Sequence, residues 1–388
     1  MTTHILNVDN IDHTLLPMFF PEAGAVGLAR YDVMRYPVFN KSTKTQRGFF
    51  WNPEEIHLSQ DKMDYKHFEP HEEHIFTATL SYQILLDSVQ GRAPSIAFLP
   101  FVGAPELEPA IQAWSFFETI HSESYTHIIR NIYNDPDVVF NKILDMPEIL
   151  ERAASVTQYY DDFIEYAWTF KLFGYGVHSV DTKDHEGRSI TGSVHDINEY
   201  GLKKRLYKCL ISVYILEGIR FYGSFACSFA FGELEKVIGN AKIIGMIARD
   251  ENQHLALVVH ILKNLKKEND PVMLKVIEDC VLEIADMFEE AVEQERVWVK
   301  FLFQQGTIIG LNEEILIEYI EHITNKRMKT IGMKQLYSAR DNNPIPWINH
   351  WLDSKNKQTA NQEIENTSYV VSGVINDINE TTFANYKL

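Results

Sequence analysis

The chain has 388 residues, of which 45% are hydrophobic and 12% aromatic, so it can bury a sizeable core and differs from disordered or fibrous proteins. Its 36 basic and 54 acidic residues give a net charge of −18, which repels phosphate backbones and anionic membrane surfaces. We therefore expect neither nucleic acid nor a membrane among its partners.

Cysteine usage and the amino terminus indicate where the protein acts. Cys209, Cys227 and Cys280 form no C-x-x-C pair, so neither a disulfide framework nor a thiolate zinc site is supported. The amino terminus lacks the basic and apolar regions of a signal peptide, and no run approaches the roughly 18 apolar residues that cross a bilayer. These features predict a soluble, cytoplasmic protein.

Helical periodicity dominates the chain, and alternating β-branched runs are nearly absent, so we predict an all-α domain over residues 1–353. Its predicted long helices, followed by shorter ones to about residue 340, are 69–91, 105–133, 148–173, 197–228, 231–266 and 271–303. The glycine-containing stretch 174–193 predicts a small hairpin or loop excursion. The Asn-rich segment 354–388 predicts a flexible tail, and the apolar residues near its end indicate docking on a partner.

The pattern Glu-x-x-His occurs three times, and the surrounding residues separate the copies. Glu118 and His121 interrupt an apolar stripe with spacings of three and four, as do Glu251 and His254. The third copy, which begins at Glu54, lacks such a stripe. We predict that the first two pairs face the interior and that Glu54 and His57 lie on the surface.

Two more acids, Asp87 and Glu217, lie on inward-facing stripes. Asp87 precedes Glu118 by 31 residues, and Glu217 precedes Glu251 by 34, so each half of the pattern is an acid-bearing helix followed by an E-x-x-H helix. Buried carboxylates are costly unless they are paired or bound to metal. Two acid-bearing and two E-x-x-H helices are the ligand arrangement of ferritin-like di-iron and di-manganese bundles. We therefore predict one dinuclear metal centre in a ferritin-like helical bundle.

An alternative explains the buried acids without metal. They could pair with three arginines that lie nearby in sequence, which are Arg130, Arg220 and Arg249. Such pairing accounts for single acids, but it does not predict two E-x-x-H copies with matched upstream acids.

Several long motifs resemble the radical-generating small subunit of class I ribonucleotide reductase. They run from about residue 29 to 351 and are "ARYD", "FFWNPEE", "LLDSVQGRAP", "ETIHSESYTHIIRNIYNDP", "EGIRFYGSFACSFAF", "GNAKIIGMIARDENQH" and "NPIPWINHWL". The resemblance implies an oxo-bridged centre of two iron ions, with manganese less favoured. Its ligands would be Asp87, Glu118, His121, Glu217, Glu251 and His254, with Glu118 and Glu251 able to bridge the metals.

The resemblance also implies a role for Tyr125, which follows His121 by one helical turn. Tyr125 would be oxidised to a stable tyrosyl radical when the diferrous centre reacts with dioxygen. Phe221, Phe225 and Ile247 would line an apolar pocket around the phenol, although core packing alone would also explain them.

A route for the radical is implied by three further residues. Trp51 and Asp250 resemble the start of a hydrogen-bonded chain from an iron-bound histidine toward the surface, and Asp250 could reach His121. Tyr369 resembles the tail tyrosine that relays the radical to the large subunit. The last residues resemble the peptide that docks there.

The resemblance therefore implies one half of an enzyme, ribonucleoside-diphosphate reductase, which reduces ribonucleotides to deoxyribonucleotides only with its large catalytic subunit. Such subunits are typically homodimers. Two rivals of the same fold remain from the ligand pattern, a di-iron oxygenase or desaturase and a ferritin-type iron store. Neither requires Tyr125 beside the centre, Trp51 with Asp250, or a docking tail.

Overall fold

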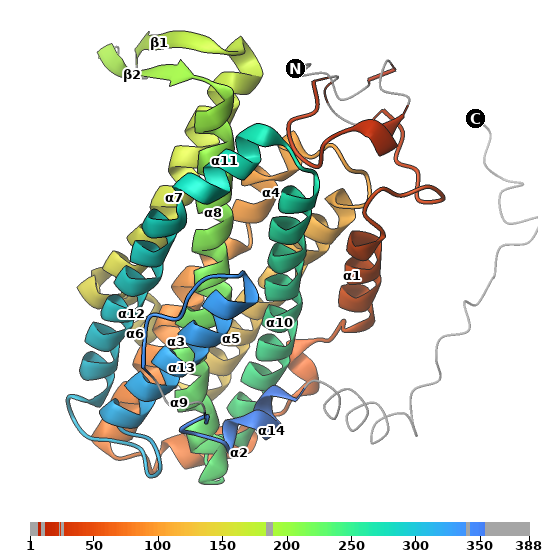
Figure 1. The fold of residues 1–388 in the computed structure, drawn as a ribbon. Helices are drawn as coiled ribbons and strands as arrows, with labels where there is room; N and C mark the ends of the chain where they lie inside the picture. The colour runs from red at the N-terminus through yellow and green to blue at the C-terminus, as the bar shows by residue number, and fades with distance from the viewer. Residues whose placement is uncertain are drawn as a thin grey trace, which may run out of the picture.

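Helices dominate the structure, as the sequence predicts. It is a computed structural model that describes residues 7–8, 12–22, 24, 27–183, 189–338 and 342–353, without the side chains of 180–183 and 189–195. The predicted all-α fold with a small hairpin is confirmed (Figure 1). The predicted tail, 354–388, lies outside the described residues, so the tail and the domain boundary before it stay predictions.

Four long helical segments form the centre of the bundle (Figure 1). They are α3 (Pro70–Gln90), α5 (Glu108–Ile132), α8 (Glu199–Ile215) continuing into α9 (Phe221–Glu233), and α10 (Ile238–Lys267). A π-helical turn, Leu216–Arg220, joins α8 to α9 without a break. The sequence predicts a helix here but gives no sign of the π-helical turn.

The starts of these helices follow familiar capping chemistry, with one exception. Pro70 opens α3, and Glu69 and Glu72 form a reciprocal capping box there. Helix α10 has no cap of its own, because the residue before it, Val237, has no polar side chain; its backbone is left-handed, with φ of 42°. Asp61 supplies the cap from a distant segment, since its carboxylate accepts from two backbone N–H groups of α10 at 3.0 and 2.6 Å.

The remaining helices surround this centre. They are α1 (Pro37–Gly48), α2 (Ser59–Tyr65), α4 (Ala93–Ala97), α6 (Asp137–Phe140), α7 (Pro147–Phe173), α11 (Pro271–Asp279), α12 (Val281–Phe303), α13 (Glu313–Thr330) and α14 (Ile348–Leu352). Short 3-10 helices cover His13–Leu15, Pro53–Glu55, Leu99–Phe101 and Ile143–Asp145.

Two differences from the predicted helices have local causes. The prediction of one helix over 271–303 is wrong, because the backbone leaves helical geometry at Cys280, where φ is −86° and ψ is 0°. No proline or glycine marks this break, so the sequence pattern does not reveal it. Helices α1 and α2 precede the first predicted helix and are too short for a sustained apolar stripe.

The predicted excursion is a two-stranded antiparallel hairpin at one end of the bundle (Figure 1). Strand β1 (Gly176–Lys183) pairs with β2 (Ser189–Ile197), and Gly176 lies opposite Ile197. The Tyr166 hydroxyl of α7 fixes the base of the hairpin by donating to the Asp196 carbonyl at 2.7 Å. The hairpin therefore lies apart from the four central segments.

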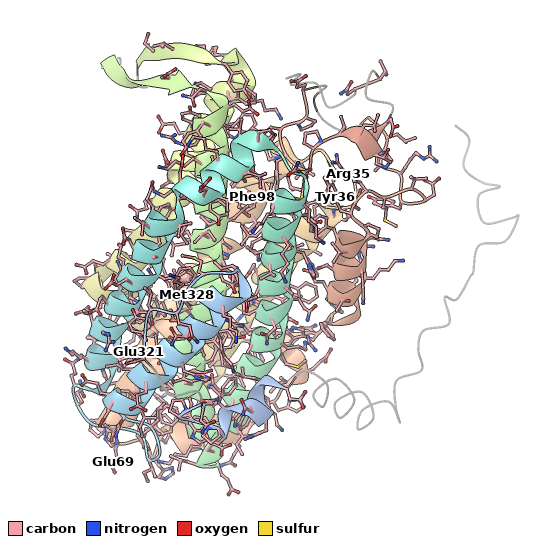
Figure 2. The ribbon with its side chains drawn as sticks, viewed as in Figure 1. Arg35, Tyr36, Glu69, Phe98, Glu321 and Met328 are labelled. Carbon is pink, nitrogen blue, oxygen red and sulfur yellow. The ribbon has the colours of Figure 1, made fainter. Side chains whose placement is uncertain are left out.

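The core is one continuous hydrophobic cluster between the helices. Phe98, labelled in Figure 2, is wholly buried and lies 6.0 Å from the ring of Phe163. The segment Glu199–Glu233 is long and apolar enough to cross a membrane by composition, but its most apolar window is 100% buried within the fold. This burial fits the central helix of a soluble protein.

Candidate metal centre

The six predicted ligands meet in the interior between the four central segments, and all of them are wholly buried. Helix α3 contributes one acid, the π-helical turn another, and α5 and α10 an E-x-x-H pair each. Their ligand atoms form two groups, each within 4.8 Å, which are Asp87, Glu118, His121 and Glu251, and Glu118, Glu217, Glu251 and His254. Glu118 and Glu251 belong to both groups.

Each of the two shared carboxylates points one oxygen toward His121 and the other toward His254. Glu118 places Oε1 at 3.0 Å from His254 Nδ1 and Oε2 at 3.2 Å from His121 Nδ1. Glu251 places Oε2 at 2.9 Å from His254 Nδ1 and Oε1 at 3.1 Å from His121 Nδ1. Asp87 completes one side, with Oδ2 at 3.9 Å from His121 Nδ1. This arrangement suits two ions joined by two bridging carboxylates.

The electrostatics of the cluster call for cations. The pKa values of Asp87 and Glu217 are raised well above the usual range. Burial is the main cause, and the charges of the neighbouring glutamates are the next. Burial acts to raise the pKa of Glu251 as well, but hydrogen bonding with Glu217 and the charge of His121 lower it. Two divalent ions would balance four ionised carboxylates.

Unpaired atoms in the cluster also fit a metal. Both oxygens of Asp87, Oε2 of Glu217 and Oε1 of Glu251 are buried without a geometric hydrogen bond. Carboxylate and imidazole donors suit iron and manganese. The residues present therefore fit a dinuclear centre of that kind.

The arginine alternative is wrong for these acids. Arg249 pairs with Asp250 at 2.9 Å, Arg220 lies 3.6 Å from Glu295, and Arg130 is exposed. Among the residues that the structure describes, no arginine forms an ion pair with any of the four acids of the cluster. Glu54 and His57 are exposed, which confirms their predicted surface position.

Neighbouring donors hold the ligand carboxylates in place. Trp114 Nε1 donates to Glu118 Oε1 at 2.9 Å. Gln90 Nε2 donates to Glu217 Oε1 at 2.5 Å, and the Tyr160 hydroxyl in turn donates to the Gln90 carbonyl oxygen at 2.9 Å. The sequence analysis did not identify Gln90 or Tyr160 as site residues. Gln90 could have been found from its position three residues after Asp87, but nothing in the sequence relates Tyr160 on α7 to the centre.

A hydrogen-bonded chain leads away from His121. Its Nε2 lies 3.4 Å from Asp250 Oδ2, and the Trp51 indole N–H donates to the same oxygen at 2.7 Å. Arg249 donates to the other Asp250 oxygen at 2.9 and 3.0 Å. The contact between Asp250 and His121 that the sequence predicts is therefore present, and it orients Nδ1 of His121 toward the ligand carboxylates.

Tyr125 lies on α5 and is wholly buried. Burial first, and then the charge of and hydrogen bond with Asp87, raises the pKa of the phenol well above its usual value. Phe221, Phe225 and Ile247 are also wholly buried, and the rings of the two phenylalanines stack at 5.8 Å. Their position around Tyr125 stays a prediction, and the remaining candidate, Tyr369, lies outside the described residues.

Comparisons with known proteins agree with this site. The family model described as "Ribonucleotide reductase, small chain" matches residues 29–344. The ribonucleoside-diphosphate reductase 1 subunit beta of Escherichia coli O157:H7 is 48% identical over 373 residues, which is 96% of either chain. The subunit beta of Enterobacteria phage T4 is 39% identical over 394 residues, covering 99% of this chain and 98% of the relative.

The fold comparison agrees with the sequence comparisons. A solved structure of the ribonucleotide reductase R2 subunit from Clostridium botulinum has a TM-score of 0.74 at 24% identity, covering 91% of this chain and 98% of that one. The predicted ferritin-like bundle is thereby confirmed. The family match also decides against an oxygenase, a desaturase or a ferritin-type iron store. The chain belongs to the small-chain family of ribonucleotide reductase, the radical-generating subunit of the class I enzyme, which acts with a large subunit.

Proposed function

We propose that the buried cluster holds two iron ions, which Glu118 and Glu251 bridge. The observation that carries this proposal is that each of these carboxylates spans both histidines. On reaction with dioxygen, the bound iron would supply the oxidising power that a phenol requires. Manganese would suit the same carboxylate and imidazole ligands, so the loading experiment below compares the two metals.

In this proposal Tyr125 is the radical residue. Its phenol would give up one electron to the oxidising centre and its hydroxyl proton to the Asp87 carboxylate. Asp87 is the carboxylate that acts on this hydroxyl electrostatically, and among the described residues neither the Asp87 oxygens nor the Tyr125 hydroxyl has a geometric hydrogen bond. Complete burial excludes water and reductants from the phenol, which protects the oxidised ring. Phe221, Phe225 and Ile247 would contribute to this exclusion.

The route out of the site runs through groups that are already hydrogen-bonded. We propose that Trp51 exchanges an electron with the centre through Asp250 and His121, because the indole, the carboxylate and the imidazole are connected in that order. Arg249 keeps the Asp250 carboxylate oriented by two further hydrogen bonds. Tyr369 would carry the radical onward in a tail, 354–388, that docks on the large subunit.

Two properties of the assembly follow from the family resemblance and are part of the proposal. The chain would form a homodimer, and it would act in the cytoplasm as one domain over 1–353 with a docking tail. Sedimentation of the full-length chain tests the first property, since a monomer at micromolar concentration would contradict it.

Electron paramagnetic resonance tests the radical directly. Metal-free protein loaded with iron(II) and exposed to air should show a tyrosyl signal, and manganese(II) loading under the same conditions should not. Tyr125→Phe should bind two irons and lose the signal. Tyr133→Phe is the matched control, because Tyr133 directly follows α5 and its hydroxyl hydrogen-bonds the Thr77 hydroxyl at 2.6 Å rather than a ligand. A tyrosyl signal that survives in Tyr125→Phe would contradict the assignment.

A further inference from the structure

The π-helical turn Leu216–Arg220 carries one ligand of the centre, Glu217, between α8 and α9. A π-helical turn widens the helix by one residue and disturbs the regular pairing of its carbonyl groups. Such turns are less favourable than an α-helix, so contacts outside the turn are needed to maintain one in a fixed position.

One such contact comes from α13, which contributes no ligand. Arg327 Nε donates to the carbonyl oxygen of Gly218, the residue directly after Glu217, at 3.1 Å. Gly218 permits this approach, because a Cβ atom there would lie 3.0 Å from Leu255 Cδ1 and 3.1 Å from Arg327 Nε. The glycine and the arginine therefore fit together at the turn.

Arg327 also contacts α9, which in turn bonds to the helix that carries the second E-x-x-H pair. Its guanidinium carbon lies 5.0 Å from the ring centre of Tyr222 on α9. The Tyr222 hydroxyl donates to the side chain of Asn252 at 2.7 Å, and Asn252 directly follows Glu251. The backbone of Arg327 is itself fixed, since the Tyr214 hydroxyl donates to its carbonyl oxygen at 2.9 Å. Arg327 thus contacts the π-helical turn directly and the flank of the second E-x-x-H pair through Tyr222.

We propose that Arg327 is a positioning residue that maintains the π-helical turn and thereby directs Glu217 into the metal centre. This inference rests on the metal-binding role proposed for Glu217. Arg327 is half-buried, and the neighbouring Met328, labelled in Figure 2, marks its place on α13 at the side of the bundle. Without Arg327, the Gly218 carbonyl loses its side-chain donor. The carbonyl groups of the turn are then free to change their hydrogen-bond partners.

The test is an anaerobic calorimetric titration of the metal-free, full-length chain with cobalt(II). The unmodified chain should bind two ions. Arg327→Met should raise one of the two dissociation constants about tenfold and leave the other unchanged, which is the range reported for losses of groups behind a ligand. Arg327→Lys keeps the charge and one donor. For the weakened ion, its dissociation constant should therefore lie between that of the unmodified chain and that of Arg327→Met.

A matched control separates positioning from general stability. Arg296 on α12 is also partly buried and pairs with Glu293 and Glu321, far from any ligand in sequence. Arg296→Met should leave both dissociation constants unchanged. Amide hydrogen exchange over residues 216–222 of the metal-free chain should become faster in Arg327→Met but not in Arg296→Met. Gly218→Ala, which displaces the Arg327 side chain, should weaken the same ion as Arg327→Met.

The titrations distinguish a positioning role of Arg327 from a general loss of stability and from the absence of a two-ion centre. Two unchanged dissociation constants in Arg327→Met would overturn the inference, as would an equal weakening of both ions that Arg296→Met reproduces. A chain without substitutions that fails to bind two ions would overturn the proposed metal centre, and the inference with it. Weakening of one ion with unchanged binding in the control supports the positioning role.

Discussion

The hydrogen bond from Gln90 to Glu217 offers a sharp test of how the surrounding residues control the metal centre. Both side chains are wholly buried, and the amide nitrogen lies 2.5 Å from Glu217 Oε1. Gln90→Leu keeps the approximate volume but removes the donor. The carboxylate oxygen would then be buried without a partner, and it would no longer be oriented toward the metal position.

The expected magnitude follows from the type of bond. A buried hydrogen bond to a charged group contributes about 1.5–3 kcal/mol, and about 1.4 kcal/mol corresponds to a tenfold change in affinity. Gln90→Leu should therefore weaken the ion at the Glu217 position by roughly 10- to 100-fold. Tyr160→Phe removes a neutral bond of 2.9 Å that orients the amide, so its effect should be about 2- to 10-fold.

Stepwise iron(II) binding to the metal-free chain, without oxygen, measures both effects. Gln83→Leu is the matched control, because Gln83 lies on the same helix, is wholly buried, and has no hydrogen bond to its amide among the described residues. This control should bind both ions as the unmodified chain does. If Gln90→Leu and Gln83→Leu bind iron equally well, the donor does not orient Glu217 and the reasoning is refuted.

Three further predictions test the centre, the fold and the tail. Glu251→Ala should lose most bound iron, because a carboxylate shared by both groups is removed, whereas Glu54→Ala should keep two irons per chain in a metal analysis. Asp61→Ala should lower the free energy of unfolding by about 2 kcal/mol in urea denaturation, since the carboxylate caps two N–H groups at the start of α10. A chain lacking 354–388 should form the radical but fail to support nucleotide reduction with the large subunit, and Tyr369→Phe should keep subunit affinity but lose turnover. Normal turnover by either tail variant would contradict a radical relay in the tail.

The sequence predicts the parts of the site that depend on spacing along one helix. Glu118 with His121, and Glu251 with His254, could be placed on inward faces because residues three and four apart share one side of a helix. Asp87 was found in the same way. Long amphipathic helices are also the elements that periodicity identifies best, which is why the all-α fold was predictable.

The features that were missed depend on contacts between distant segments. Tyr160 supports the centre from α7, and Asp61 caps α10 across 178 residues of sequence separation. Neither relation leaves a periodic signal in the chain. The π-helical turn at Leu216–Arg220 adds one residue to a helix without a proline or an unusual composition, so only the observed backbone reveals it. The break at Cys280 is hidden for the same reason.

The residues behind the ligands explain how a cluster of four buried acids can fold before metal arrives. Removing carboxylates from water is unfavourable, and their mutual repulsion in the interior adds to this cost. The indole of Trp114 and the amide of Gln90 each donate to one oxygen of a ligand glutamate. Because Oε2 of Glu217 has no geometric hydrogen bond, it stays available to an ion while Oε1 is held. The surrounding donors thus offset part of the burial cost and leave the metal-facing atoms free, so that the residues behind the ligands contribute both to folding and to metal affinity.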